Sequence, residues 1–152
     1  MKVYRISKTF FIKDISGTGA RIYGGRWNHK GVSILYTSQS RALATVEYLV
    51  HVPLSLKPKN LSIASIELPD DVSIKEVLKE DLPANWRDSP PPSEIASIGT
   101  GWILAGNTLG LRVPSASVEN DFNLLINPVH PEMSRVKIVT IEPYEVDRRL
   151  LR

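Results

Sequence analysis

The chain has no cysteine among its 152 residues. Disulfide bonds, thiolate metal sites and a cysteine nucleophile are therefore excluded, and this absence is typical of proteins that work in a reducing cytoplasm. The sequence also has no apolar stretch long enough to cross a membrane, and its N-terminus lacks the apolar core of a secretion signal. From these absences we expect a cytoplasmic protein without a membrane segment.

The sequence also lacks a large excess of positive or negative charge and has no metal-binding pattern. The net charge is only +3, and lysines and arginines are scattered except in the basic residues 148–152. Nucleic-acid binding requires a basic stripe interleaved with aromatic side chains, so we expect no direct contact with DNA or RNA. The three histidines, His29, His51 and His130, lack the spacing of metal ligands, and we expect no metal site.

What remains is a pattern of short strands and two helices. We expect one helix from Ser40, as its cap, to about His51, and a second from Ser93, as its cap, to a stop at Gly106. Glycine, proline and polar residues dominate 14–31 and 82–93, which we predict to be loops. The predicted strands are residues 3–6 (an edge strand), 34–36, 61–68, 109–113, 122–126 and 136–141.

Regular alternation of strands and helices is absent, and so is a G-x-G-x-x-G turn. Both absences argue against a dinucleotide-binding Rossmann sheet. We therefore predict a single compact α+β domain over residues 1–152, with short mixed or antiparallel strands and a few helices.

Glu47 lies on the first predicted helix, four residues after Leu43 and three before Val50. With Val46, these two residues define the stripe that we expect to be buried, so Glu47 shares an apolar face. An unpaired carboxylate there is costly. We expect Arg26 or Tyr36 to satisfy it.

Arg26 follows the pair Gly24-Gly25 and precedes a tryptophan. Two adjacent glycines permit a tight turn or a close backbone approach, and arginine offers a planar fork of donors to phosphate or carboxylate. The residues alone predict a polar pocket that contains arginine, tyrosine and glutamate. They leave open that Arg26 and Glu47 form a buried structural ion pair and that Tyr36 is an ordinary core tyrosine.

These residues fall into an ordered pattern that resembles the RES-domain family, named for arginine, glutamate and serine. The resemblance covers nearly the whole chain and departs from the family pattern at 117–122 and at Leu124. Its first block comprises Gly24-Gly25-Arg26-Trp27-Asn28, Gly31, Tyr36-Thr37-Ser38, Ala42-Leu43-Ala44 and Glu47, and its second comprises Val113-Pro114-Ser115-Ala116, 123–128 and His130-Pro131.

The resemblance implies an ADP-ribosyltransferase-like fold and the toxin of a type II toxin–antitoxin system that degrades NAD⁺. NAD⁺ would be the substrate, with no further cofactor. The implied partner is a helix-turn-helix antitoxin of the Xre type that covers the active site, and a homodimer is allowed. Carried over by position, Arg26, Tyr36 and Glu47 match the catalytic residues, while Arg26, Tyr36, Ser115 and Asn123 match residues that bind NAD⁺.

Three functions are thus open. The first is breakdown of NAD⁺ with water or phosphate as the acceptor. The second is mono-ADP-ribosylation of a protein. The third is a binding role for an inactive homologue in which Arg26 and Glu47 form a purely structural pair.

Overall fold

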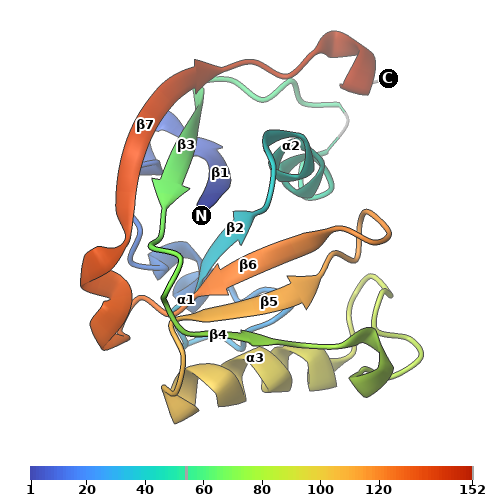
Figure 1. Cartoon of the computed structure of the whole chain (residues 1–152). Helices are drawn as coiled ribbons and strands as arrows, with labels where there is room; N and C mark the ends of the chain where they lie inside the picture. The colour runs from blue at the N-terminus through green and yellow to red at the C-terminus, as the bar shows by residue number, and fades with distance from the viewer. Residues whose placement is uncertain (54, 152) are drawn as a thin grey trace.

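A seven-stranded mixed sheet organises the chain, in the strand order β4–β5–β6–β2–β1–β3–β7 (Figure 1). Within the described residues, β4 and β5 pair in parallel and the other neighbouring strands pair antiparallel. The computed structural model describes residues 1–53 and 55–151, so Leu54 and Arg152 of the expected 1–152 domain lie outside the described residues. The strands are β1 Lys2–Lys8, β2 Leu35–Ser38, β3 Leu61–Glu67, β4 Ile74–Glu76, β5 Gly110–Pro114, β6 Phe122–Ile126 and β7 Lys137–Tyr144.

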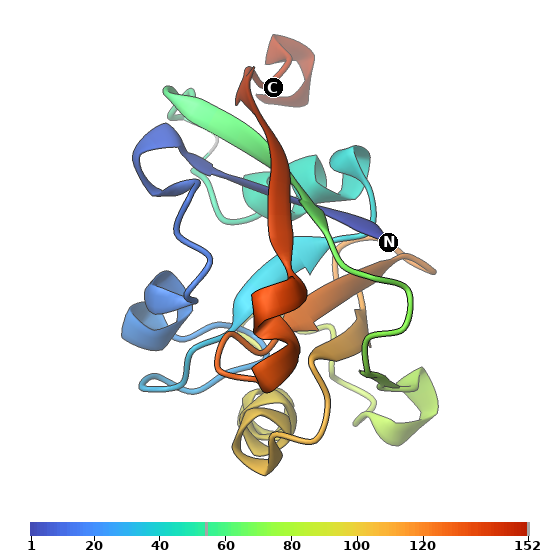
Figure 2. The same ribbon diagram turned by 60° about the vertical axis from the view of Figure 1, so that its left-hand side comes forward.

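The helices are short, and they lie around the sheet. The α-helices are α1 Thr18–Tyr23, α2 Arg41–Leu49 and α3 Ser93–Ala105. Single 3-10 turns are η1 Thr9–Phe11, η2 Lys79–Asp81, η3 Pro131–Arg135 and η4 Arg148–Leu151. Helix α3 lies at one end of the molecule and η4 at the other (Figures 1 and 2). The prediction of an α+β fold is confirmed.

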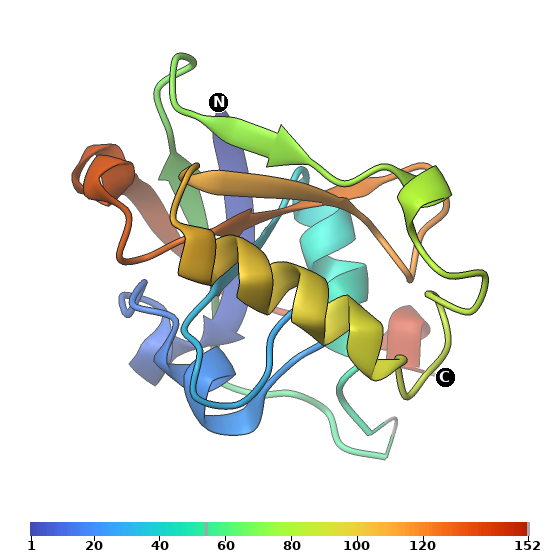
Figure 3. The ribbon, with the colours of Figure 1, turned by 90° about the horizontal axis from the view of Figure 1, so that it is seen from below.

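Two apolar cores form because side chains alternate across the strands. On β6, Leu124 and Ile126 face a core shared with β1, β2 and β3, whereas Leu125 faces a second core. Helix α3 covers this second core, where Ile95 and Trp102 pack with residues of β5 and β6 (Figure 3). The two cores fix β6 and β2 between them, and these two strands carry side chains of the site described below.

Helix α3 docks closely on the turn that precedes β2. A Cβ atom placed on Gly99 would lie 1.8 Å from the backbone oxygen of Trp27, so only glycine permits this approach. The backbone N–H of His29 also donates to Thr100 Oγ1 at 3.0 Å. The helix ends as predicted at Gly106, which has φ of 64°, but Ser93 is its first residue rather than its cap.

Helix α2 packs against β1 and β2 and begins as predicted after Ser40, whose side chain accepts from the backbone N–H of Leu43 at 3.0 Å. It ends at Leu49, two residues before His51. The predicted buried stripe is confirmed at Leu43 but wrong at Val46 and Val50, which are exposed. The buried face consists of Leu43, Ala44 and Thr45.

The sequence pattern also misplaced or missed other elements. Strand β1 is not an edge strand, since it pairs with both β2 and β3. The predicted loop 14–31 contains α1, and β4 was not predicted at all. Helix α1 is shorter than two helical turns, and β4 has only 3 residues. Both are too short to show a periodic pattern.

Candidate active site

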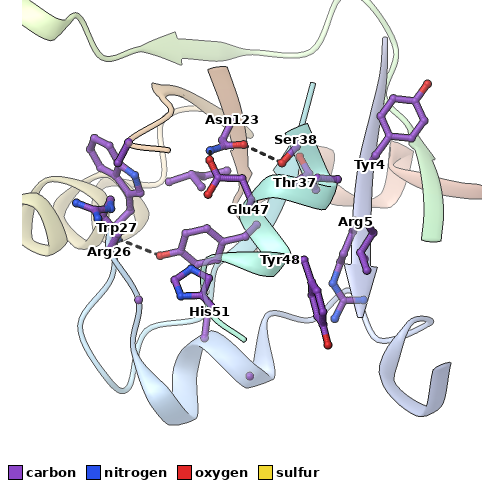
Figure 4. Close-up of a pocket in the computed structure, with 18 of the residues that line it drawn as sticks. Tyr4, Arg5, Arg26, Trp27, Thr37, Ser38, Glu47, Tyr48, His51 and Asn123 are labelled. Carbon is purple, nitrogen blue, oxygen red and sulfur yellow. Dashed lines mark hydrogen bonds between the residues drawn. The ribbon is translucent and has the colours of Figure 1, made fainter. Parts of the chain in front are cut away.

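One cavity of about 560 Å³ lies where β1, α1, β2, α2 and β6 meet. Among the residues that line it are Arg26, Tyr36, Glu47 and Asn123, four of the five side chains expected at the site. Figure 4 shows Arg26 and Glu47 facing this cavity from different elements, the turn after α1 and helix α2. The fold therefore joins residues that are far apart in the sequence.

Neutral donors hold the Glu47 carboxylate. Its Oε1 accepts from Ser115 Oγ at 2.6 Å and from Asn123 Nδ2 at 2.8 Å. Among the described residues, the other oxygen, Oε2, has a single long contact of 3.4 Å with Ser117 Oγ. Hydrogen bonds from neutral groups leave the negative charge of the carboxylate in place, and Oε2 is the oxygen with spare capacity for a ligand.

Ser115 follows β5 and lies behind Glu47, with only 2% of its surface exposed. Its oxygen accepts from the backbone N–H groups of Ser117 at 3.1 Å and Val118 at 3.0 Å. These two bonds occupy the acceptor sites of the hydroxyl and direct its hydrogen at Glu47. Ser115 therefore contacts the carboxylate of Glu47, and its expected contact with NAD⁺ stays a prediction.

Arg26 is half-buried in the turn between α1 and β2. Its Nη1 donates to the backbone oxygens of Trp86 at 2.8 Å and Asp88 at 3.1 Å. Burial lowers the pKa of Arg26, and the charge of Glu47 opposes this shift. An arginine nevertheless remains cationic. Within the described residues, its Nε and Nη2 have no protein acceptor, so they are available to an anionic ligand.

The Tyr36 hydroxyl supports the turn that carries Arg26. It accepts from the backbone N–H of Trp27 at 3.1 Å and donates to Asn28 Oδ1 at 2.6 Å. Burial raises the pKa of Tyr36, so the hydroxyl stays protonated and able to donate. A Cβ atom at Gly25 would lie 2.8 Å from this hydroxyl, which explains why the turn needs glycine there.

The expected contact between Arg26 and Glu47 is not formed. No ion pair joins them among the described residues, and the carboxylate is satisfied by Ser115 and Asn123 instead. The hypothesis of a structural Arg26–Glu47 pair is therefore wrong. The two opposite charges face one cavity without neutralising each other.

Sequence reasoning missed several residues that line the cavity. Arg5 on β1 adds a second cation, and burial lowers its pKa while the charge of Asp14 opposes the shift. Tyr48 and His51 follow Glu47 by one and four residues, and both line the cavity. The helical spacing of His51 relative to Glu47 was a usable signal, whereas nothing in the sequence linked Arg5 to the site.

The described part of the chain has neither a metal-binding cluster nor a membrane-spanning helix. No group of three or more histidine, cysteine, aspartate or glutamate side chains there is arranged to hold a metal ion. No helix in residues 1–53 and 55–151 is both long and apolar enough to cross a membrane.

Known proteins share both sequence and fold with this chain. It is 38% identical over 148 residues to the Prs ADP-ribosylating toxin of Sphingobium sp. (strain YBL2), covering 96% of this chain and 92% of that protein. It is 40% identical over 131 residues to a protein named Toxin Res from Yersinia enterocolitica, covering 86% of each. The crystal structure of the M. tuberculosis MbcT–MbcA toxin–antitoxin complex contains a chain with a similar fold, at a TM-score of 0.75 and 17% identity, covering 99% of this chain and 86% of that chain.

The family relationship follows from the extent of these matches. A family model described as RES domain matches residues 2–147, almost the whole chain. The relatives named above are similar over most of their own length as well. The protein therefore belongs to the RES-domain family.

Proposed function

We propose that this protein is the toxin of a toxin–antitoxin pair and that it consumes NAD⁺ by breaking the bond between nicotinamide and ribose. One observation carries the proposal. The Glu47 carboxylate, which is held by neutral donors, shares a cavity with a cation, Arg26, without pairing to it. Such an arrangement suits a substrate with a cationic reacting end and an anionic pyrophosphate.

Glu47 is the proposed catalytic carboxylate. Cleavage of the nicotinamide–ribose bond develops positive charge on the ribose, as in glycoside hydrolysis, and a nearby carboxylate stabilises that charge. Oε2 is the oxygen that would contact the ribose, because Ser115 and Asn123 already donate to Oε1. Nicotinamide leaves as a neutral pyridine, so the reaction requires no general acid.

Arg26 is the proposed anchor for the pyrophosphate or the ribose, through the donors that its loop contacts leave available. Arg5 supplies a second positive charge in the same cavity. Tyr36 presents its ring to the nicotinamide end while its hydroxyl holds the turn. Ser115 and Asn123 then serve the reaction by orienting Glu47.

Substitution of Glu47 tests this proposal. Glu47→Gln keeps the size of the side chain but removes its charge, and loss of one such electrostatic contact lowers turnover by a factor of about 10²–10³. Release of nicotinamide from NAD⁺ by the purified protein gives the rate. Glu80→Gln, on exposed η2 and outside the cavity, is the matched control. A folded Glu47→Gln protein with wild-type turnover would contradict the assignment.

The group that accepts ADP-ribose distinguishes the main proposal, NAD⁺ breakdown, from a second candidate function. Water or phosphate as acceptor would give ADP-ribose or its phosphorylated form in solution. The name of the Sphingobium relative, an ADP-ribosylating toxin, favours transfer to a protein as the second candidate. Incubation with adenine-labelled NAD⁺, with and without phosphate and a cell extract, separates these outcomes: label stays in small molecules for the first and becomes attached to protein for the second.

The proposed partner is an antitoxin of the helix-turn-helix Xre type. An enzyme that consumes NAD⁺ in the cytoplasm of its own cell requires an inhibitor, and a partner segment seated in the cavity would exclude the substrate. A carboxylate on that segment would pair with Arg26 as the substrate phosphate does. Co-expression of the chain with the protein encoded by the neighbouring gene is expected to restore growth. The resulting complex should not bind NAD⁺. Binding without loss of turnover would exclude occlusion as the mechanism.

A homodimer also stays a prediction. The molecular mass of the purified protein in solution tests it.

A further inference from the structure

The side chain of Asn123 connects Glu47 to strand β2. Its Nδ2 donates to Glu47 Oε1 at 2.8 Å, and its Oδ1 accepts from Ser38 Oγ at 2.8 Å (Figure 4). Ser38 and Asn123 are direct partners in the antiparallel pairing of β2 with β6. The sheet register therefore sets the spacing between the hydroxyl and the amide.

The two ends of an amide have opposite hydrogen-bonding roles. Only the NH₂ group of Asn123 can donate to a carboxylate, and only its carbonyl oxygen can accept from a hydroxyl. If the amide turned over, Oδ1 would face Glu47 Oε1 and two acceptors would meet. The bond from Ser38 stabilises the productive orientation, in which Glu47 receives a donor.

We infer that Ser38 is a positioning residue that acts through Asn123 to keep a hydrogen-bond donor on Glu47 and so fixes the orientation of its carboxylate toward the substrate. This inference rests on the proposed function. Ser38 is only 5% exposed although it belongs to the cavity lining, and its hydroxyl is engaged by Asn123 Oδ1. With Ser115 and Asn123 both bonded to Oε1, the carboxylate cannot rotate without losing two bonds.

The primary experiment is Ser38→Ala in the purified full chain, with kcat and KM for NAD⁺ measured separately. We expect kcat to fall roughly 10- to 100-fold, the effect of weakening a hydrogen bond to a charged group. KM should change little, because the phosphate-binding cations are untouched. Ser38→Thr keeps the hydroxyl and should restore most of kcat.

A matched control separates positioning from folding. Ser62→Ala also removes a buried hydroxyl from a strand, since Ser62 is 3% exposed and its Oγ lies 2.8 Å from Thr9 Oγ1, outside the cavity. We expect this variant to lose similar thermal stability but to keep wild-type kcat. Equal kcat values for Ser38→Ala and Ser62→Ala would overturn the inference.

A double-mutant cycle tests whether Ser38 acts through Asn123. In an Asn123→Ala background, Ser38→Ala should cause no further loss of kcat, because the amide that it orients is gone. Additive losses would show that Ser38 acts by another route and would overturn the inference.

Nuclear magnetic resonance of the Asn123 side-chain NH₂ group gives a readout independent of activity. In the wild-type protein we expect its hydrogens to exchange slowly, and in Ser38→Ala quickly. Unchanged exchange would overturn the role of Ser38 whether or not NAD⁺ is the substrate. A wild-type protein with slow exchange but no NAD⁺ turnover would instead contradict the proposed function and leave the orienting contact supported.

Discussion

Gly99 offers a sharp test of how the fold places Arg26. It is a buried residue in the interior of α3, where replacement of glycine by alanine ordinarily stabilises a helix by about 1 kcal/mol. Here an alanine Cβ would lie 1.8 Å from the backbone oxygen of Trp27 and 2.8 Å from its carbonyl carbon. The clash is with backbone, which cannot rotate away as a side chain could.

The magnitude follows from the distance that must be gained. Real Cβ contacts essentially never fall below 3.0 Å, so Gly99→Ala must separate α3 from the turn by about 1.2 Å at this point. Overpacking costs about 1–3 kcal/mol, and a backbone clash belongs at the upper end of that range. After subtraction of the helix-propensity gain, we expect a net loss of about 2 kcal/mol in the free energy of unfolding.

Activity should suffer more than stability in the same variant. The displaced residue, Trp27, directly follows Arg26, and a misplacement of about 1 Å in a substrate-positioning group can reduce turnover by about 100-fold. Urea titration measures the free energy of unfolding, and nicotinamide release from NAD⁺ measures turnover of the folded protein.

Gly101→Ala is the matched control on the same helix, because nothing lies within 4 Å of its added Cβ atom. That variant should be up to about 1 kcal/mol more stable than the wild-type protein, with unchanged turnover. If Gly99→Ala behaved like Gly101→Ala, the close docking of α3 on the turn would be refuted.

Three further substitutions test the site directly. Arg26→Lys removes the planar fork, so NAD⁺ should bind at least about ten-fold more weakly in calorimetry at nearly the same melting temperature; unchanged affinity would exclude Arg26 as a ligand contact. Tyr36→Phe leaves buried Asn28 Oδ1 without its donor and should lower the free energy of unfolding by about 1–3 kcal/mol. Because burial raises the pKa of Tyr36, the wild-type protein should be fully stable below the ordinary tyrosine value of 10.0 and lose stability as the pH rises above it. Urea titrations below and above pH 10.0 check this prediction. If Tyr36→Phe lost as much stability at alkaline pH as the wild-type protein, the loss would belong to another group. Ser115→Ala should lower turnover roughly 10- to 100-fold by freeing Glu47, and a fully active variant would argue against that role.

The sequence identified two charged residues of the site, Arg26 and Glu47, because each carries a local structural cost. Glu47 stands out as a carboxylate four residues after the apolar Leu43, although the expected apolar stripe is wrong at Val46 and Val50. The carboxylate does have partners, but they are Ser115 and Asn123. The glycines before Arg26 stand out because a turn and a close approach require them. The structure bears this out at Gly25, which lies against the Tyr36 hydroxyl.

The partners of these residues were beyond local reasoning. Ser115 and Asn123 lie 68 and 76 residues from Glu47 in the sequence, and pairing of β2 with β6 helps to bring them together. An apolar pattern predicts that a strand exists but not which strands flank it, which is why β1 was misplaced at an edge. The family resemblance placed Ser115 and Asn123 at the site, and the structure adds that they contact Glu47.

The opposite charges of Arg26 and Glu47 have independent supports, and this separation follows from the fold. Arg26 is held by the turn after α1, by the loop carbonyls of Trp86 and Asp88, and indirectly by α3. Glu47 is held by side chains that follow or belong to β5 and β6. Had the two residues satisfied each other, a substrate would first have to break a buried ion pair, which costs several kcal/mol. Because neutral groups satisfy Glu47 and backbone oxygens engage Arg26, both charges are already oriented before a ligand arrives. Such preorganisation is what allows fixed charges to stabilise a transition state without the cost of rearranging them.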